Sequence, residues 1–296
     1  MKVKFDCLCL TEKYARWLMP SDPSTNYNNA IKQHHSDTGS WLLEHDMYKD
    51  WKEKPNSFMW IHGIRECMSN RKHMSFSGHL QLVQEKQFFC RSHISLDIND
   101  LLTLQSSTIV QDIELIAQKG SIGLAYFYCD VSDSQKRNAF DILSSLVINL
   151  LSWEPQTQSV LEKAYDDCRN GVSKPPNDRL LEVLKQFISG FKMAYILIDA
   201  LDECLKLREI LDFIQTLYAW NLDQCHLLVT SRKEPQIVDF MRSIKLMEVD
   251  MSQMPVDNDI KKYIEFVLQS SPDLGKWNEN EKVLIRDALF GKAKGM

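Results

Sequence analysis

The chain has 296 residues, of which 44% are hydrophobic and 25% are charged, and this balance is that of a globular protein able to bury a substantial core. The formal net charge of −5 gives no overall electrostatic case for nucleic-acid binding. The apolar runs are only of strand length and the N-terminal stretch has no signal-peptide pattern, so the sequence predicts neither a membrane span nor a cleaved leader.

The eight cysteines are dispersed, and none forms a C-x-x-C pair. Such cysteine usage in a chain of this length is typical of a reduced, intracellular protein, so we expect a cytoplasmic location. Cys7 and Cys9 lie close in sequence, but no nearby histidine or cysteine completes a zinc set. Cys129, Cys204 and Cys225 lie in or beside predicted buried strands, and we expect them to be packed free thiols.

The N-terminal part of the chain reads as a helical lead-in followed by a strand. The first 55 residues are mixed and rich in tryptophan, with a capped helix start near Trp41. The apolar run at 56–61 predicts a buried strand that ends at Gly63. Residues 65–104 show no period of 2 or 3.6, and we interpret them as an irregular insertion.

From Ser106 onward the pattern is regular, and predicted strands alternate with predicted helices. The strands are 124–128, 193–198, 226–230 and 245–249. The helices are 107–117, 139–151, 160–168, 179–188, 207–218, 257–268 and 281–289. Apolar strands that alternate with helices predict a parallel sheet covered on both faces. We therefore expect an α/β fold of three layers, with a lead-in over 1–55, a core over 56–250 and the helical start of a C-terminal lid over 251–296.

The strongest local signal is an apolar strand that runs directly into acidic residues, Tyr195-Ile-Leu-Ile-Asp199-Ala-Leu-Asp202-Glu203. In a parallel sheet, Asp199 would stand at a carboxyl strand end, where open α/β sheets bind ligands. In P-loop NTPases an aspartate at this place holds Mg²⁺, and a following acid can orient the attacking water. The alternative is that Asp202 and Glu203 only cap the next helix at its positive end.

The next predicted strand also ends in polar residues, at Thr230, Ser231 and Arg232. An arginine at this strand tip could contact a terminal phosphate. The alternative is an ordinary polar strand end, which is common. The position of Arg232 one helix after Asp199 favours the functional interpretation.

Together these residues resemble the fungal-type NACHT domain, also called nephrocystin N-terminal-like, within the STAND class of P-loop ATPases. The resembling blocks are 17–23, 39–43, 56–64, 125–130, 198–204 and 230–235. The resemblance implies an ATP-driven switch that controls self-assembly in a sensing pathway, with ATP and Mg²⁺ as cofactors. Its implied partners are further copies of the chain or signalling proteins, whereas the charge and the short apolar runs predict neither nucleic acid nor a membrane as a partner.

The resemblance also implies roles for particular residues. Asp199 would be the magnesium residue, and Asp202 and Glu203 would be the catalytic acidic pair. Arg232 would be the sensor arginine. Gly63 and Thr103 would belong to the nucleotide site, Gly63 as the first residue of the phosphate-binding loop and Thr103 in the place of its threonine.

The phosphate-binding loop itself departs from the family pattern. The family's first strand runs into G-x-x-x-x-G-K-[ST], whereas here Arg65-Glu-Cys-Met follows soon after Gly63. If Thr103 takes the place of the loop threonine, Leu101 and Leu102 stand at the glycine and lysine positions. Losing two or three charge-assisted phosphate bonds removes about 4–6 kcal/mol of binding free energy, roughly a thousandfold or more in affinity. We therefore expect a degenerate or fragmentary switch domain with weak or no ATP hydrolysis.

Two alternatives stay open. Residues 65–102 are either a genuine insertion or a segment left by incorrect splicing, and splicing that restores Gly-Lys-Thr would give an active, Mg-ATP-hydrolysing switch. A non-catalytic interaction module that keeps the fold for self-association requires only the core strands, and these are present.

Overall fold

The computed structural model describes residues 11–21, 24–33, 39–63, 98–118, 120–133, 138–153, 158–254 and 257–270, together with 278–280, 282–283 and 286. Within these residues one sheet of five strands is formed, and every strand pair in it is parallel. The strands are β1 (Ser57–Gly63), β2 (Ile122–Tyr128), β3 (Met193–Asp199), β4 (Cys225–Arg232) and β5 (Met247–Asp250). Their order across the sheet is β2-β3-β4-β1-β5, so the carboxyl ends of β1, β3 and β4 lie next to one another.

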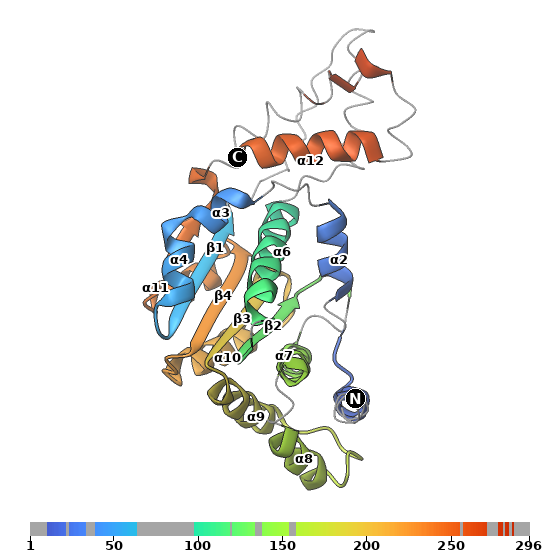
Figure 1. The fold of residues 1–296 in the computed structure, drawn as a ribbon, viewed down its shortest axis with the longest axis vertical. Helices are drawn as coiled ribbons and strands as arrows, with labels where there is room; N and C mark the ends of the chain where they lie inside the picture. The colour runs from blue at the N-terminus through green and yellow to red at the C-terminus, as the bar shows by residue number, and fades with distance from the viewer. Residues whose placement is uncertain are drawn as a thin grey trace.

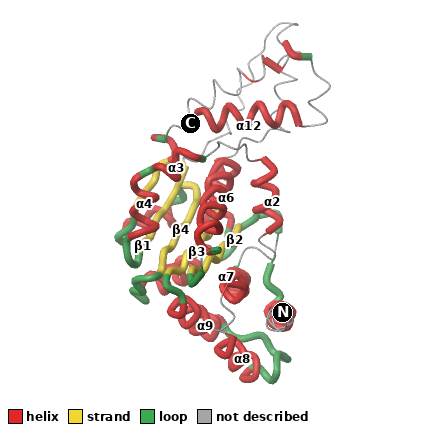
Figure 2. The backbone as a smooth tube through the Cα atoms, viewed as in Figure 1, coloured by secondary structure: helices red, strands yellow, loops and turns green. Residues whose placement is uncertain are grey.

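Helices cover both faces of this sheet, which confirms the expected three-layer α/β class (Figures 1 and 2). Residues 11–18 are helical, and the labelled helices before β2 are α2 (Ser24–Gln33), α3 (Ser40–Glu44), α4 (Asp46–Glu53) and α6 (Ile98–Ala117). The later helices are α7 (Ala139–Trp153), α8 (Gln158–Asp167), α9 (Asn177–Gly190), α10 (Leu207–Ala219), α11 (Pro235–Arg242) and α12 (Asp257–Ser270). Short 3₁₀ turns follow β3 and β5, namely η3 (Leu201–Glu203) and η4 (Met251–Gln253). No helix among the described residues is both long and apolar enough to cross a bilayer.

The strands contribute side chains to two hydrophobic cores, one on each face, because successive residues of a strand point to opposite sides. In β1, Phe58 and Trp60 belong to one core, and Met59 and Ile61 belong to the other. The first core includes side chains of α7, α8, α9, α10 and α11, and the second includes side chains of α2, α3, α4 and α6. In Figure 1, α6 lies across the second face between α4 and α2.

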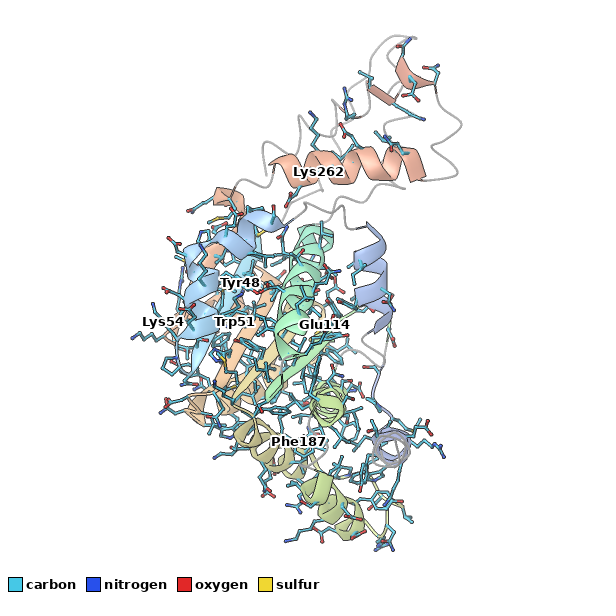
Figure 3. The ribbon with its side chains drawn as sticks, in the orientation of Figure 1. Tyr48, Trp51, Lys54, Glu114, Phe187 and Lys262 are labelled. Atoms are coloured by element: carbon cyan, nitrogen blue, oxygen red, sulfur yellow. The ribbon has the colours of Figure 1, made fainter. Side chains whose placement is uncertain are left out.

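Hydrogen bonds hold α6 between these two helices. Tyr48 of α4 donates to Asp112 Oδ2 over 2.6 Å, and Lys52 Nζ donates to the same oxygen over 2.7 Å. Tyr27 of α2 donates to Glu114 over 2.9 Å. In Figure 3, Tyr48 lies between α4 and α6, and Glu114 lies on the side of α6 that faces α2. The position of α6 is decisive for the site described next, because this helix carries two of its hydroxyl groups.

The start of α6 differs from the prediction. The helix begins at Ile98 and not near Ser107, so residues 98–104 are helical rather than irregular. The prediction is wrong here because serine and threonine are typical helix caps. In the structure, Ser107 Oγ instead donates to the Thr103 carbonyl over 2.7 Å, a bond to the preceding turn that accommodates a hydroxyl inside a helix. Residues 64–97, the rest of the expected insertion, lie outside the described residues.

Candidate functional site

Asp199 stands at the carboxyl end of β3 and is only 2% exposed. Its carboxylate accepts hydrogen bonds from three hydroxyl groups. Thr103 of α6 donates to Oδ2 over 2.6 Å, and Thr230 of β4 donates to Oδ1 over 2.6 Å. Ser106 of α6 also donates to Oδ1. The site therefore joins β3, β4 and the first part of α6 at the carboxyl edge of the sheet.

The electrostatic state of Asp199 follows from its burial. Desolvation raises the pKa of Asp199 above its ordinary value, and the bonds from Ser106, Thr103 and Thr230 act in the opposite direction. Within the described ranges the partners of this carboxylate are hydroxyl groups and not a cation. A desolvated carboxylate that is compensated only by neutral dipoles is a favourable place for a metal ion.

Asp202 and Arg232, both expected at the site, are bound to each other. Arg232 Nε donates to Asp202 Oδ2 over 2.6 Å, and the Arg232 backbone N–H donates to Asp202 Oδ1 over 2.8 Å. The Asp202 side chain is fully buried, and that of Arg232 is 26% exposed. A phosphate group that approached Arg232 would therefore have to share the guanidinium with Asp202 or displace it.

Glu203 follows Asp202 in η3 and has a different partner. Its Oε2 accepts the backbone N–H of Val131, just beyond β2, over 2.8 Å. The backbone N–H of Cys129 donates to the carbonyl of Asp199 over 3.0 Å. The segment after β2 is thus tied twice to the acidic turn that follows β3.

Two residues that the sequence reasoning missed complete the site, namely Ser106 and Thr230. Thr230 Oγ1 accepts the N–H of Ala200 over 3.0 Å while its own proton goes to Asp199. Ala200 has a φ of 54°, a left-handed conformation unusual for a residue other than glycine. The sequence could have indicated Ser106 as a site residue, because it lies three residues after Thr103 and this spacing places both hydroxyl groups on one face of a helix.

Gly63 ends β1 at the same edge of the sheet, where it is in register with Arg232 of β4. Its carbonyl accepts the backbone N–H of Lys233 over 3.4 Å. The preceding residue, His62, is fully buried, and its Nε2 lies 2.7 Å from Glu248 Oε1. Among the described residues, His62 Nδ1 has no hydrogen-bond partner.

The oxygen donors around Asp199 fit Mg²⁺, which prefers oxygen ligands and is commonly held by one or two carboxylates together with substrate phosphates. No group of three or more His, Cys, Asp or Glu in the described residues could hold a metal ion. A metal at Asp199 would therefore need further oxygen ligands, such as hydroxyls or phosphates.

The fit to phosphate is poorer. Leu102, at the expected lysine position, is apolar and fully buried. Thr103 lies inside α6, which begins at Ile98, rather than in the first turn, where free backbone N–H groups would point at an anion.

Two comparisons show which known proteins the chain is similar to. Residues 103–232 match the family model described as Nephrocystin 3, N-terminal. The chain is also similar to the vegetative incompatibility protein HET-E-1 of Podospora anserina, with 26% identity over 180 residues. That alignment covers 58% of this chain but only 13% of the relative, so the chain spans a small part of that protein's length.

Proposed function

We propose that the chain acts as the nucleotide-binding switch domain of a signalling protein, with residues 103–232 forming a nephrocystin N-terminal-like domain of the NACHT type, because these residues match that family model. The proposed cofactors are ATP and Mg²⁺. The observation that carries the proposal is the contact between Thr103 of α6 and Asp199 of β3 at the carboxyl edge of the sheet. P-loop NTPases hold Mg²⁺ with this pair of residue types, a hydroxyl from the loop that opens the helix and an acidic residue from a strand end.

Each site residue has a role in this proposal. Asp199 and Thr103 would hold the magnesium ion, whose charge would offset that of the phosphates. Their present bond would then open, so that the hydroxyl oxygen of Thr103 faces the ion. Glu203 would position a water molecule, and Arg232 would contact the terminal phosphate after release from Asp202.

We further propose that this member is degenerate, with weak nucleotide binding and no measurable hydrolysis. A buried leucine stands where a phosphate-binding lysine is expected, and Arg232 is already bound to Asp202. Breaking that ion pair would cost binding free energy, because Asp202 is fully buried and would lose its partner.

Isothermal titration of the whole chain with Mg-ATP tests this proposal. We expect a dissociation constant of about 1 mM or weaker, weakened further in Asp199→Ala, with no phosphate release. Asp178→Ala is the matched control, because Asp178 is an exposed acid in the first turn of α9 and should leave binding unchanged. If the wild type bound Mg-ATP with a low-micromolar dissociation constant and Asp199→Ala lost this binding, the proposed degeneracy would be refuted. If Asp199→Ala bound Mg-ATP as the wild type does, Asp199 would not belong to the nucleotide site.

The active switch is the second candidate, and the Thr103–Asp199 contact also favours it. Replacing residues 65–102 with Pro-Gly-Cys-Gly-Lys would make Thr103 follow a lysine. If the missing loop is the main defect, this chain should bind and hydrolyse ATP, and Asp199→Ala should abolish hydrolysis again. Continued inactivity of a folded repaired chain would point to the Arg232–Asp202 pair as a second obstacle.

We also propose a cytoplasmic location and self-association as the mode of signalling. The dispersed cysteines support the first, and the similarity of the chain to a vegetative incompatibility protein supports the second. Sedimentation of the chain over a range of concentrations, with and without Mg-ATP, tests self-association directly.

A further inference from the structure

Two cysteine thiols are in contact beside the acidic turn. The sulfur atoms of Cys129 and Cys204 lie 2.7 Å apart, although the two residues are 75 positions apart in the sequence. Both are free thiols, with 3% of Cys129 and 8% of Cys204 exposed. A disulfide bond is about 2.0 Å long, so the sulfurs need to approach by less than about 1 Å to form one.

Bonds on the two neighbouring segments keep these sulfurs together. The backbone N–H of Cys129 donates to the Asp199 carbonyl over 3.0 Å. Two residues further on, the N–H of Val131 donates to Glu203 over 2.8 Å, and Cys204 directly follows Glu203. These two hydrogen bonds hold the segment after β2 against the turn after β3. The sulfur contact therefore depends on the backbone as well as on the two side-chain rotamers.

We propose that Cys129 and Cys204 form an oxidation site, at which a hydroperoxide converts the two thiols into a disulfide. The proposal goes beyond the nucleotide switch and does not depend on it. Because both thiols are nearly buried, the site admits only a small oxidant such as hydrogen peroxide. Cys204 is the more exposed of the two and precedes Leu205, which is 66% exposed, so the oxidant meets Cys204 first.

The reaction balances in two steps. In the first, the Cys204 thiol takes one oxygen from hydrogen peroxide, the O–O bond breaks, and a sulfenic acid and one water are formed. In the second, the Cys129 sulfur attacks the Cys204 sulfur, and the S–O bond breaks. The departing hydroxide takes the Cys129 proton and leaves as a second water. The dithiol loses two electrons and two protons, and the peroxide is reduced to two waters.

The surroundings of Cys129 make it a poor first target for the oxidant. Burial, together with the contact to Cys204, raises the pKa of the Cys129 thiol, so this residue stays protonated, and it reacts with the sulfenic acid only because the two sulfurs are already in contact. Cys168 and Cys225 are also buried and free, but no other pair among the described cysteines is in sulfur contact. These two residues therefore provide matched internal controls.

Peptide mapping of the whole chain tests the proposal. The reduced protein is treated with graded hydrogen peroxide in native buffer, remaining thiols are alkylated, and the protein is digested without reductant. We expect a linked peptide pair containing Cys129 and Cys204, two hydrogens lighter than the sum of the two, that disappears on treatment with dithiothreitol. In Cys168→Ser the link should form to the same extent as in the wild type.

Two single variants separate the steps. In Cys129→Ser, the sulfenic acid on Cys204 should persist and be trapped by dimedone, whereas in Cys204→Ser the dimedone adduct on Cys129 should be absent. Linkage of Cys129 or Cys204 to some other cysteine, or no link at peroxide levels that oxidise exposed thiols, would overturn the proposal. The wild-type measurement stands even if a variant fails to fold.

Discussion

Asp199 is a buried carboxylate, and in the ligand-free protein its charge is unfavourable. Its pKa is raised in the folded state, so the native protein holds this proton more tightly than the unfolded chain does. The folded state is therefore favoured below the ordinary pKa and loses stability as pH rises through the folded pKa. The ionised form of Asp199 is therefore less favourable in the folded protein than in the unfolded chain, as is common where a site is built for a ligand.

Asp199→Asn should accordingly stabilise the ligand-free protein. The amide keeps the shape of the side chain and removes the need to bury an ionisable group, and the three hydroxyls can reorient toward it. We expect a gain of about 1 kcal/mol at neutral pH, or roughly 2–4 °C in melting temperature. Asp178→Asn, at an exposed position, should change the melting temperature little. A lower melting temperature for Asp199→Asn would show that the charged form is needed for folding.

His62 predicts a second pH effect, of opposite sign. Burial, with a smaller contribution from Lys233, lowers the pKa of His62, whereas Glu248 and Asp250 act to raise it. The unfolded chain thus binds a proton near pH 6.5 that the native protein resists. The stability contributed by neutral His62 is fully present above pH 6.5 and is lost as pH falls through this window.

His62→Phe should weaken this pH dependence. The phenyl ring keeps the packing on Trp60, 4.2 Å away between ring centroids, and has no titrating group. Between about pH 7.5 and 5.5, the wild type should lose up to about 1.4 kcal/mol more than the variant in free energy of unfolding. Urea titrations at the two pH values measure this difference. His226, also buried, is present in both proteins, so its contribution cancels. Equal losses in both proteins would assign the acid sensitivity to other groups.

At the scale of elements, the sequence predicts the strands well, because a strand covered on both faces must be apolar along its length. Each predicted core strand was found with its ends shifted by only a few residues. The pattern of apolar residues does not predict the start of α6, because the serine and threonine residues in its first half are typical of a helix cap. It also fails for α11, a helix of eight residues that was not predicted and that begins at Pro235. The helix expected over 281–289 lies largely outside the described residues.

The candidate site also has features that the sequence predicts and features that it does not. Strand ends in one parallel sheet meet at one edge, so the sequence could predict that Asp199 and Arg232 would lie near each other. It could not predict that Arg232 is bound to Asp202 or that Thr230 donates to Asp199, because these contacts depend on rotamers and on the left-handed turn at Ala200. The assigned roles of these residues stay predictions until nucleotide binding is measured.

At the scale of the whole molecule, one carboxylate joins α12 to the core. Gly39 N–H, Trp41 Nε1 and Gln105 Nε2 donate to Asp259 Oδ2 over 2.8, 3.1 and 3.2 Å. Asp259 is only 4% exposed. In Figure 1, α12 lies beyond the end of the sheet toward which β1 points, next to α3. Gln105 directly precedes Ser106, so α6 contacts α12 and the Asp199 site with adjacent residues.

Asp259→Ala should therefore release α12 while the sheet stays folded. The change leaves two buried donors, from Gly39 and Gln105, and the partly buried Trp41 Nε1 without their acceptor, and each buried group left unpaired costs about 1–3 kcal/mol. We expect amide hydrogen exchange in α12 to accelerate by roughly tenfold or more, with protection in β3 and β4 unchanged. Lys261→Ala, at an exposed position on the same helix, is the matched control and should exchange like the wild type. If α12 kept its protection, the three bonds would be incidental to its position. If β3 and β4 lost protection to the same degree as α12, then α12 would be an integral part of the core rather than an element that can move over it.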